Sequence, residues 1–543
     1  GGPKFSFKSS FNPGAAEFVP SWLPQPPAQS QAPQQTYAPQ QTYVPQQSYQ
    51  QQSYQQPQRT VQPPAARPTS AQTKPAEKKI SPKKEQKEPV KKAEKPSTPT
   101  PKVEEPEEPV DMTGIKENVN IIFMGHVDAG KSTMGGHILL LTGMVDKRTM
   151  EKYEQEAKEL GRESWYLSWA LDLNEEERAK GKTTEYGRGC FITDKRRFTI
   201  IDAPGHRNFI PSMIEGAAQA DIGILVVSAR RGEFETGFER DGQTREHALL
   251  AKTAGVKRLI LVVNKMDDPT VEWEQQRYDE IVEKISPFLR GVGYTKNDID
   301  VLPISGYTGA NMKDRVDPSI CPWYTGPPLL ELLDNVALDR KYSGPLLMPI
   351  ADKMKDMGTI ALGKLESGMV KKGASVLIMP NKTKAEVLAI FQDENEVTVA
   401  HNGDNVRLRL KGVDEEDVLP GFVLCGPKNP VHAVTAFEAQ IQVVEYPSIM
   451  CAGYSAVMHC HTTREEVTIS ELLHKIDKKT KRKSKAPPQF MRQGDVAIVR
   501  IDCTRLVCLE TYDDYPQLGR FTIRDEARTV AVGKVTKLLY DSA

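Results

Sequence analysis

One nine-residue motif restricts the fold more than any other stretch of the chain. Residues 125–133 read GHVDAGKST and match the phosphate-binding pattern G-x-x-x-x-G-K-[ST]. Residues 119–124 before it are apolar and rich in β-branched side chains, as a buried strand is, and residues 134–141 after it are compatible with a helix. In this context backbone N–H groups and the positive end of the helix face a phosphate group. The alternative is an ordinary glycine turn.

The motif and two later segments predict a site for phosphates and Mg²⁺. Lys131 is expected to reach the β- and γ-phosphates, and the Ser132 hydroxyl to bind Mg²⁺. Asp202, in a DAPG segment that follows a strand, can hold Mg²⁺ through water, and Gly205 can offer its N–H to the γ-phosphate. A mobile loop could bring the hydroxyl of Thr183 to the same ion. The motif residues expected to bind the nucleotide are Asp128, Ala129, Gly130, Lys131, Ser132 and Thr133.

Two further segments predict that the base is guanine. The NKMD segment contributes Asn264, Lys265 and Asp267, and the SGY segment contributes Ser305, Gly306 and Tyr307. The Asp267 carboxylate can accept two hydrogen bonds from guanine N1 and N2, which adenine cannot provide. Backbone N–H groups of the SGY segment can bind guanine O6. GTP and GDP are therefore the expected ligands.

His206 directly follows the DAPG segment and is the candidate catalytic residue. A histidine at that position can orient the attacking water and stabilise charge in the transition state. The alternative is a solvent-facing histidine in a turn. The sequence offers no arginine finger of comparable clarity, so intrinsic hydrolysis is expected to be slow and to need an external trigger.

Composition divides the 543 residues into several parts, because the chain is too long for one core. The fold class expected is an α/β P-loop GTPase domain followed by two β-barrel domains, with a disordered N-terminal extension. Strand and helix patterns alternate over residues 113–340, whereas short strands separated by turn signals follow at 344–428 and 433–543. The 72 basic and 72 acidic residues balance, so any patch for nucleic acid must be local.

Two features that the sequence lacks bear on the cellular compartment of the protein. The sequence has no apolar run of 18 residues, and we expect no secretory signal, because the first residues given do not show a basic segment followed by an apolar one. Its seven cysteines are scattered, as free thiols in a reducing compartment are. The His459-Cys460-His461 cluster sits on an expected strand, where neighbours point to opposite faces. That alternation argues against one shared metal ion.

Residues 1–112 are rich in Gln, Tyr and Pro and then in charged residues, a composition that cannot offset the entropy of ordering. Residues 9–22 differ, because they hold an isolated apolar cluster that is either chance or a docking peptide. This segment resembles the short motif that binds the C-terminal domain of poly(A)-binding protein, although Phe11 stands where Leu is usual. The matching positions are Phe11, Asn12, Ala15, Phe18 and Pro20.

Residues 519–525, GRFTIRD, form an expected strand of the last barrel. Alternation puts Phe521 and Ile523 on one face, toward the core, and Arg520 and Arg524 on the other. We therefore expect the segment of Arg520, Phe521 and Arg524 to bind a partner through the outward arginines. Pairing of both arginines with acids of this chain is the alternative.

From residue 118 onward the sequence resembles the translational GTPases of the elongation factor 1-alpha group. Within that group it is closer to the release-factor GTPases, because residues 181–185 read GKTTE where elongation factors usually have GITID, and because of the extension and its docking segment. The resemblance implies a cytoplasmic GTPase that uses Mg²⁺. It would deliver a class I eukaryotic release factor to the ribosomal A site at stop codons, and no membrane is implied.

Three alternatives stay open. The related elongation factors deliver aminoacyl-tRNA, and the related ribosome-rescue GTPases share the three-domain body. A scaffold that binds nucleotide without turnover is the third, and Thr183 and His206 argue against it.

Overall fold

The structure is a computed structural model of the chain. It describes residues 116–540 except 162–164, 172–182, 184–185, 240–241, 339, 341–343, 394, 447, 478 and 527. The predicted extension at 1–112 and its docking segment lie outside the described residues. Among the described residues, no helix is both long enough and apolar enough to cross a bilayer.

An α/β domain, residues 116–338, is built on one sheet. Its strands are β1 Glu117–Met124, β2 Gly187–Ile192, β3 Arg196–Asp202, β4 Ile222–Ser228, β5 Arg258–Asn264 and β6 Ile299–Pro303. They lie in the order β2-β3-β1-β4-β5-β6, with β2 antiparallel to β3 and all other neighbours parallel. The predicted parallel sheet is confirmed, and the antiparallel edge strand β2 is an addition to it.

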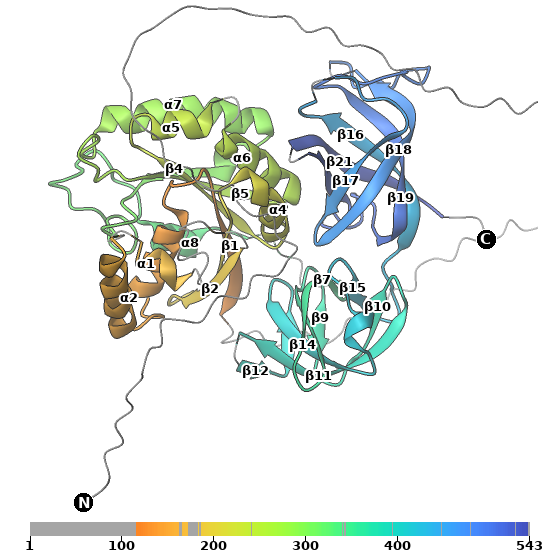
Figure 1. Cartoon of the computed structure of the whole chain (residues 1–543), viewed down its shortest axis with the longest axis horizontal. Coiled ribbons are helices and arrows are strands. Elements are labelled where there is room, and N and C mark those ends of the chain that lie inside the picture. Colours follow the sequence, from red (N-terminus) through yellow and green to blue (C-terminus); the bar gives the residue numbers. More distant parts are fainter. Residues whose placement is uncertain are drawn as a thin grey trace, which may run out of the picture. The chain divides into compact units, whose positions relative to one another are not determined.

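Helices cover both faces of this sheet (Figure 1). They are α1 Lys131–Leu141, α2 Lys147–Glu159, α4 Ile210–Ala218, α5 Glu233–Phe238, α6 Gln243–Ala254, α7 Gln275–Val292 and α8 Leu329–Asn335. Because side chains alternate along a strand, Ile122 and Met124 of β1 pack with α4, α6 and α7, whereas Ile121 and Phe123 pack with α1 and α8. Two cores therefore hold β1 from opposite sides and fix the loop that follows it.

The first barrel, residues 344–426, is antiparallel. Its ring is formed by β7 Leu347–Lys355, β8 Thr359–Lys364, β10 Ser375–Met379, β11 Thr383–Gln392, β14 Asn405–Lys411 and β15 Val423–Cys425. The short strand β12 Asn395–Val397 pairs with β11, while β9 Met369–Lys371 and β13 Val399–His401 form a separate two-stranded sheet. The ring closes because β10 pairs with both β15 and β11.

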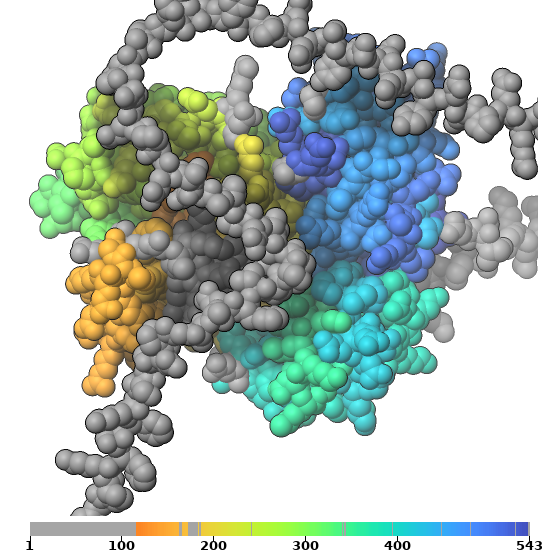
Figure 2. All heavy atoms as spheres, viewed as in Figure 1, coloured from red at the N-terminus to blue at the C-terminus, as the bar shows by residue number. Residues whose placement is uncertain are grey.

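The second barrel, residues 433–540, closes with six strands. They are β16 Ala433–Val443, β17 Tyr454–Cys460, β18 Thr463–Ile476, β19 Val496–Cys508, β20 Arg520–Asp525 and β21 Arg528–Leu539, in the order β16-β19-β18-β17-β20-β21. Its atoms form one continuous blue surface in Figure 2. Full closure removes the unpaired sheet edges that would otherwise invite association. The prediction of two barrels after an α/β domain is confirmed, and all seven cysteines are free thiols.

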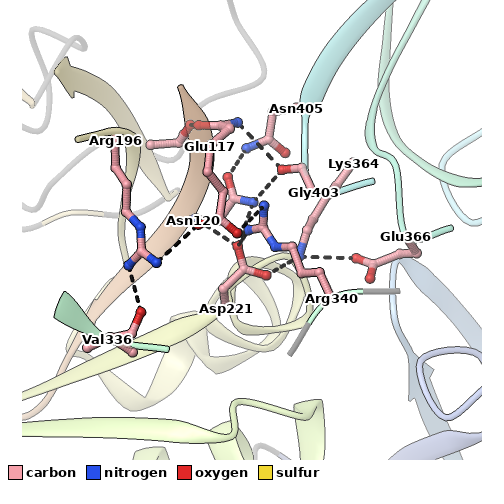
Figure 3. A network of polar contacts seen from close by, with 12 residues as sticks. Glu117, Asn120, Arg196, Asp221, Val336, Arg340, Lys364, Glu366, Gly403 and Asn405 are labelled. Carbon is pink, nitrogen blue, oxygen red and sulfur yellow. Dashed lines mark hydrogen bonds and ion pairs between the residues drawn. The ribbon is translucent and has the colours of Figure 1, made fainter. Parts of the chain in front are cut away.

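A buried polar network joins the α/β domain to the first barrel (Figure 3). Asp221, next to β4, accepts hydrogen bonds from the Asn120 backbone N–H at 2.9 Å and from Lys364 Nζ of β8 at 3.0 Å. Arg340, in the connection between the domains, also pairs with Asp221. Asn120 in turn donates its Nδ2 to the Gly403 carbonyl at 2.9 Å.

The same network extends to the second barrel. Lys364 Nζ lies 3.5 Å from Glu366 Oε1, which is 3.2 Å from His461 Nε2. Burial would raise the pKa of Glu366, but Lys364 and the His461 contact hold it at about 2. Lys364 and Arg340 likewise outweigh burial and keep the pKa of Asp221 below its usual value. Both carboxylates therefore stay ionised at neutral pH, and their charges are balanced by cations from other parts of the chain.

We expect Asp221→Asn to destabilise the junction by about 3–5 kcal/mol, because removing one partner of a buried ion pair leaves the other charge uncompensated. Lys364 is 2 % exposed and would lose its shorter ion pair, keeping only the 3.5 Å contact with Glu366. The measurement is the urea midpoint of the chain followed by tryptophan fluorescence. Glu396→Gln, which breaks the exposed pair with Lys372, is the matched control and should shift the midpoint far less. Equal midpoints for the two variants would contradict the assignment.

Candidate nucleotide-binding site

The loop between β1 and α1 has the backbone of a phosphate-binding loop. Asp128 and Gly130 adopt positive φ values of 60° and 92°, and Gly130 is the N-cap of α1. A Cβ at Gly130 would lie 2.3 Å from Asn264 Nδ2, so only glycine fits there. Successive amides in such a conformation make a concave anion site, to which the N-terminus of α1 adds positive charge.

Lys131 lies inside this loop. Its Nζ donates to the Gly125 carbonyl at 3.1 Å and to the His126 carbonyl at 2.7 Å. Burial lowers the pKa of Lys131 to about 8, while Asp202 opposes the shift. The ammonium group therefore stays largely protonated at neutral pH and supplies the positive charge that a phosphate needs.

The oxygen groups predicted for a metal ion meet beside Lys131. Ser132 Oγ and Thr183 Oγ1 lie 3.4 Å apart, although they are 51 residues apart in the chain. Asp202, at the end of β3, is fully buried and close enough to Lys131 to raise the pKa of that side chain. Two hydroxyls and a carboxylate form the oxygen-rich set that Mg²⁺ prefers, so these residues fit the ion.

Gly205 and His206 close the phosphate end of the site. A Cβ at Gly205 would lie 2.5 Å from Lys131 Nζ and 3.0 Å from the Val127 amide nitrogen, which shows how closely the two segments approach. His206 is half-buried, and its Nδ1 accepts a hydrogen bond from the Asn208 N–H at 3.3 Å. Nε2 is therefore the ring nitrogen left to form a hydrogen bond with a water molecule. A cavity of about 110 Å³ is lined by Lys131, Ser132, Thr133, Thr183, Gly205 and His206, among others.

Asn264 connects the base segments to the phosphate loop. Its Nδ2 donates to the Ala129 carbonyl, and its Oδ1 accepts from the Lys265 and Gly306 amides, each at 2.8 Å. The sequence predicted Asn264 as a nucleotide ligand. These hydrogen bonds show that its side chain also holds three loops together.

The other residues predicted to bind the guanine base differ in their exposure and in whether they already have partners within the protein. Asp267 is half-buried at the start of the loop after β5. Lys265 Nζ pairs with Glu233 at 2.8 Å. The Ser305 amide donates to the Ala310 carbonyl at 3.2 Å, and the Gly306 amide is taken by Asn264, so two of the three SGY amides have protein acceptors. Tyr307 is 51 % exposed.

Sequence reasoning missed one residue of the loop, His247 of α6. Its Nδ1 accepts a hydrogen bond from the Gly125 amide at 3.0 Å, across 122 residues. Burial, followed by the charge of Lys131, lowers its pKa to about 3, so the ring stays neutral and can accept. The signal was not visible in the sequence, because a histidine within an amphipathic helix reads as an ordinary core or surface residue.

The prediction for strand β20 was half right. Phe521 and Ile523 are in the core of the second barrel, as alternation predicted, so the inclusion of Phe521 among partner-contacting residues is wrong. Arg520 and Arg524 do point away from that core, but the α/β domain covers them. Arg524 Nη1 donates to Glu246 Oε1 of α6 at 2.9 Å and is buried.

Arg520 has a similar position. A Cβ at Gly255, at the end of α6, would lie 2.1 Å from Arg520 Nη1, and burial lowers the pKa of this guanidinium. Arg520 is nevertheless only half-buried, and its Nε donates to the Pro516 carbonyl at 2.7 Å. The expectation of an arginine exposed for another protein is therefore contradicted for Arg524, and it stays a prediction for Arg520. Alternation within one strand cannot reveal which domain lies over it.

Three families match the chain in order. Residues 116–339 match the elongation factor Tu GTP binding domain, residues 358–425 match elongation factor Tu domain 2, and residues 436–536 match the GTP-eEF1A C-terminal domain-like family.

Curated relatives give a finer comparison. The chain is 62% identical over 431 residues to a protein of Candida albicans named eukaryotic peptide chain release factor GTP-binding subunit, covering 79% of this chain and 60% of that protein. A protein of the same name from Kluyveromyces lactis is 61% identical over 432 residues, with 79% and 62% covered. The chain thus spans about three fifths of the length of these relatives.

A solved structure has the same fold. The GTPase-like domain of S. cerevisiae Ski7, bound to GTP, aligns with a TM-score of 0.65 at 17% identity, over 78% of this chain and 97% of that one. At this identity the likeness concerns the fold alone.

We expect His247→Ala to weaken nucleotide affinity roughly tenfold, because a buried Gly125 amide left without an acceptor costs about 1–3 kcal/mol. His247→Asn, whose Oδ1 can accept in place of Nδ1, should recover most of the affinity. The measurement is fluorescence titration with a mant-labelled guanine nucleotide. Equal losses for Ala and Asn would indicate a packing effect, not a positioned acceptor.

Proposed function

Because the chain belongs to the translational GTPases with an elongation factor Tu-type GTP-binding domain, we propose that it binds and hydrolyses GTP in translation termination. It delivers a class I eukaryotic release factor to the ribosomal A site at stop codons. The observation that carries the GTPase part is the shared cavity of Lys131, Ser132, Thr183, Gly205 and His206. The termination part is supported by the names of the curated relatives and by residues 181–185.

Each residue of that cavity has a chemical task. Lys131 and the loop amides neutralise and hold the phosphates, and the Gly205 amide binds the γ-phosphate. Ser132, Thr183 and, through water, Asp202 would hold Mg²⁺, which neutralises charge on the phosphate oxygens when it is bound. His206 orients the attacking water through Nε2. Phosphoryl transfer depends on such positioning and charge stabilisation more than on covalent steps by the protein.

Guanine is the base that the remaining residues support. Asp267 accepts from guanine N1 and N2. The Tyr307 amide is the donor to O6, because the Ser305 and Gly306 amides are donated within the protein. Asn264 joins the loops around the base to the phosphate loop. The base and the phosphates of one nucleotide therefore bind to a single connected set of loops.

The partners follow from the same proposal. A class I release factor and the ribosome are the macromolecules on which termination depends, and the site of action is the cytoplasm. The segment at 9–22 docks poly(A)-binding protein. The domain boundaries at 112, 340 and 428 separate this docking function from the GTPase domain and the two barrels.

Asp267→Asn should weaken GTP binding and favour xanthine nucleotides. A pocket built on such hydrogen bonds rejects a ligand that cannot pair by on the order of 10⁴-fold. Competition between GTP, XTP and ATP for the wild type and the variant is the measurement. ATP binding as tight as GTP binding by the wild type would overturn the guanine assignment.

His206→Ala should lower ribosome-stimulated hydrolysis by roughly 10²-fold or more, because it removes water orientation and leaves the phosphate ligands in place. Nucleotide affinity should change by no more than a few-fold. Phosphate release in the presence of ribosomes and the class I factor is the assay, and His432→Ala, in the connection just before β16, is the control. Unchanged stimulated hydrolysis would identify His206 as a turn residue.

Phe18→Ala should abolish binding of the chain to the poly(A)-binding-protein domain, because a buried aromatic commonly carries most of a small interface. Deletion of residues 1–112 should leave stimulated hydrolysis largely intact. Isothermal titration with the isolated partner domain tests the first statement. Undiminished binding by the variant would refute the docking assignment.

A further inference from the structure

The connection between β18 and β19 carries most of the uncompensated positive charge of the second barrel. Residues 477–495, which connect the two strands, contain seven Lys or Arg residues and two Asp, although the whole chain is balanced. The described cations at its tip are exposed, namely Lys479, Lys481, Arg482, Lys483 and Lys485. Such a local excess attracts polyanions.

The two acids of this connection do not neutralise the cations at its tip. Asp495 pairs with Lys475 of β18 at 2.7 Å. The Asp477 carboxylate accepts hydrogen bonds from the Lys479 and Thr480 amides at 2.8 and 2.7 Å. These backbone bonds lower its pKa, which shows that the carboxylate serves the turn. Among the described residues, no ion pair engages Lys481, Arg482 or Lys483.

A groove of about 1140 Å³ lies beside this connection on the outside of the second barrel. Lys481 and Lys483 line it from the connection, and Lys534 and Lys537 line it from β21. Gln440 and Gln442 of β16 also line it; they alternate with buried Ala439 and Ile441 and so point outward. We call these six lining residues, Lys481, Lys483, Lys534, Lys537, Gln440 and Gln442, the basic groove.

The two acids of the groove leave its charge positive. Glu438 pairs with Lys537 at 3.5 Å, and Asp477 is held by backbone amides. Lys534 Nζ lies 5.3 Å from the centroid of the Tyr512 ring, a contact that leaves its positive charge in place.

The chemistry of the basic groove fits a sugar–phosphate chain. Lysine ammonium groups bind phosphate oxygens as point charges, without the fixed bidentate geometry of arginine. All four groove cations are lysines. The two glutamine amides can donate to and accept from ribose hydroxyls, including the 2′-hydroxyl of RNA.

We propose that the basic groove binds the backbone of RNA without base specificity. This interaction is separate from the GTP chemistry, because the nucleotide residues belong to the α/β domain. Phosphate contacts of this kind position a protein on RNA and make binding depend on salt.

The test uses the full chain and a fluorescein-labelled 20-base-pair RNA duplex, measured by anisotropy between 50 and 200 mM KCl. Lys481→Gln, Lys483→Gln, Lys534→Gln and Lys537→Gln are combined in one variant. The control variant removes four cations of the α/β domain, Lys152, Lys284, Arg290 and Lys296, so both lose the same charge. Circular dichroism and nucleotide affinity check that each variant is folded.

The groove variant should bind at least tenfold more weakly at 100 mM salt, and its salt slope should fall by about 3, as losing four phosphate contacts predicts. The control should change less than threefold. A second variant limited to exposed tip residues, Lys481→Gln, Arg482→Gln and Lys483→Gln, should show a smaller loss in the same direction. Equal losses in the groove and control variants would overturn the proposal. Displacement of the duplex by poly-glutamate at equal charge would also overturn it, in favour of an acidic protein partner.

Discussion

Asn264 holds together the segments on which nucleotide binding depends. Its side chain is buried and makes three hydrogen bonds of 2.8 Å, to the phosphate loop, to the start of the NKMD loop and to the SGY loop. These loops are brought to one edge of the sheet by β1, β5 and β6, whose carboxyl ends meet there because the strands are parallel. Loss of the amide would leave several buried polar groups unsatisfied, each at a cost of about 1–3 kcal/mol. The close approach also explains why Gly130 must lack a side chain.

The three domains meet through buried charged side chains. Unlike apolar side chains, each of these needs an oppositely charged or hydrogen-bonding partner. Asp221, Lys364 and Glu366 are ionised, and each depends on a partner from another element. Such a network adds little net stability compared with apolar packing, but it is costly to break at one point. It therefore specifies which domain arrangement is allowed more than it increases stability. Its loss on acidification follows from the depressed carboxylate pKa values: the contribution is present above the usual carboxylate range and is lost as pH falls toward about 2.

The sequence predicted the local structure and a set of residues that the structure brings together, and it failed where contacts depend on domain packing. The loop at 125–133, Thr183, Gly205 and His206 came from short patterns whose chemistry is local, and the structure brings them around one cavity. His247 could not be predicted, because its bond to Gly125 depends on how α6 packs against β1. The prediction that Arg524 contacts a partner protein failed for a related reason. The period of two along β20 predicted its direction correctly, but only the tertiary structure places Glu246 opposite it.

Helix α6 links these two unpredicted contacts. Glu246 and His247 are neighbours, and their side chains leave the helix in different directions because adjacent residues are about 100° apart. Glu246 binds Arg524 and Thr529 of the second barrel, each at 2.9 Å, while His247 binds the phosphate loop at 3.0 Å. One turn of α6 therefore contacts both the barrel and the predicted phosphate-binding loop. A displacement of the second barrel that pulled on Glu246 would change the position of His247 and the conformation of Gly125. Since coupling between two sites is reciprocal, a nucleotide that fixes the loop would also favour the barrel position that satisfies Glu246.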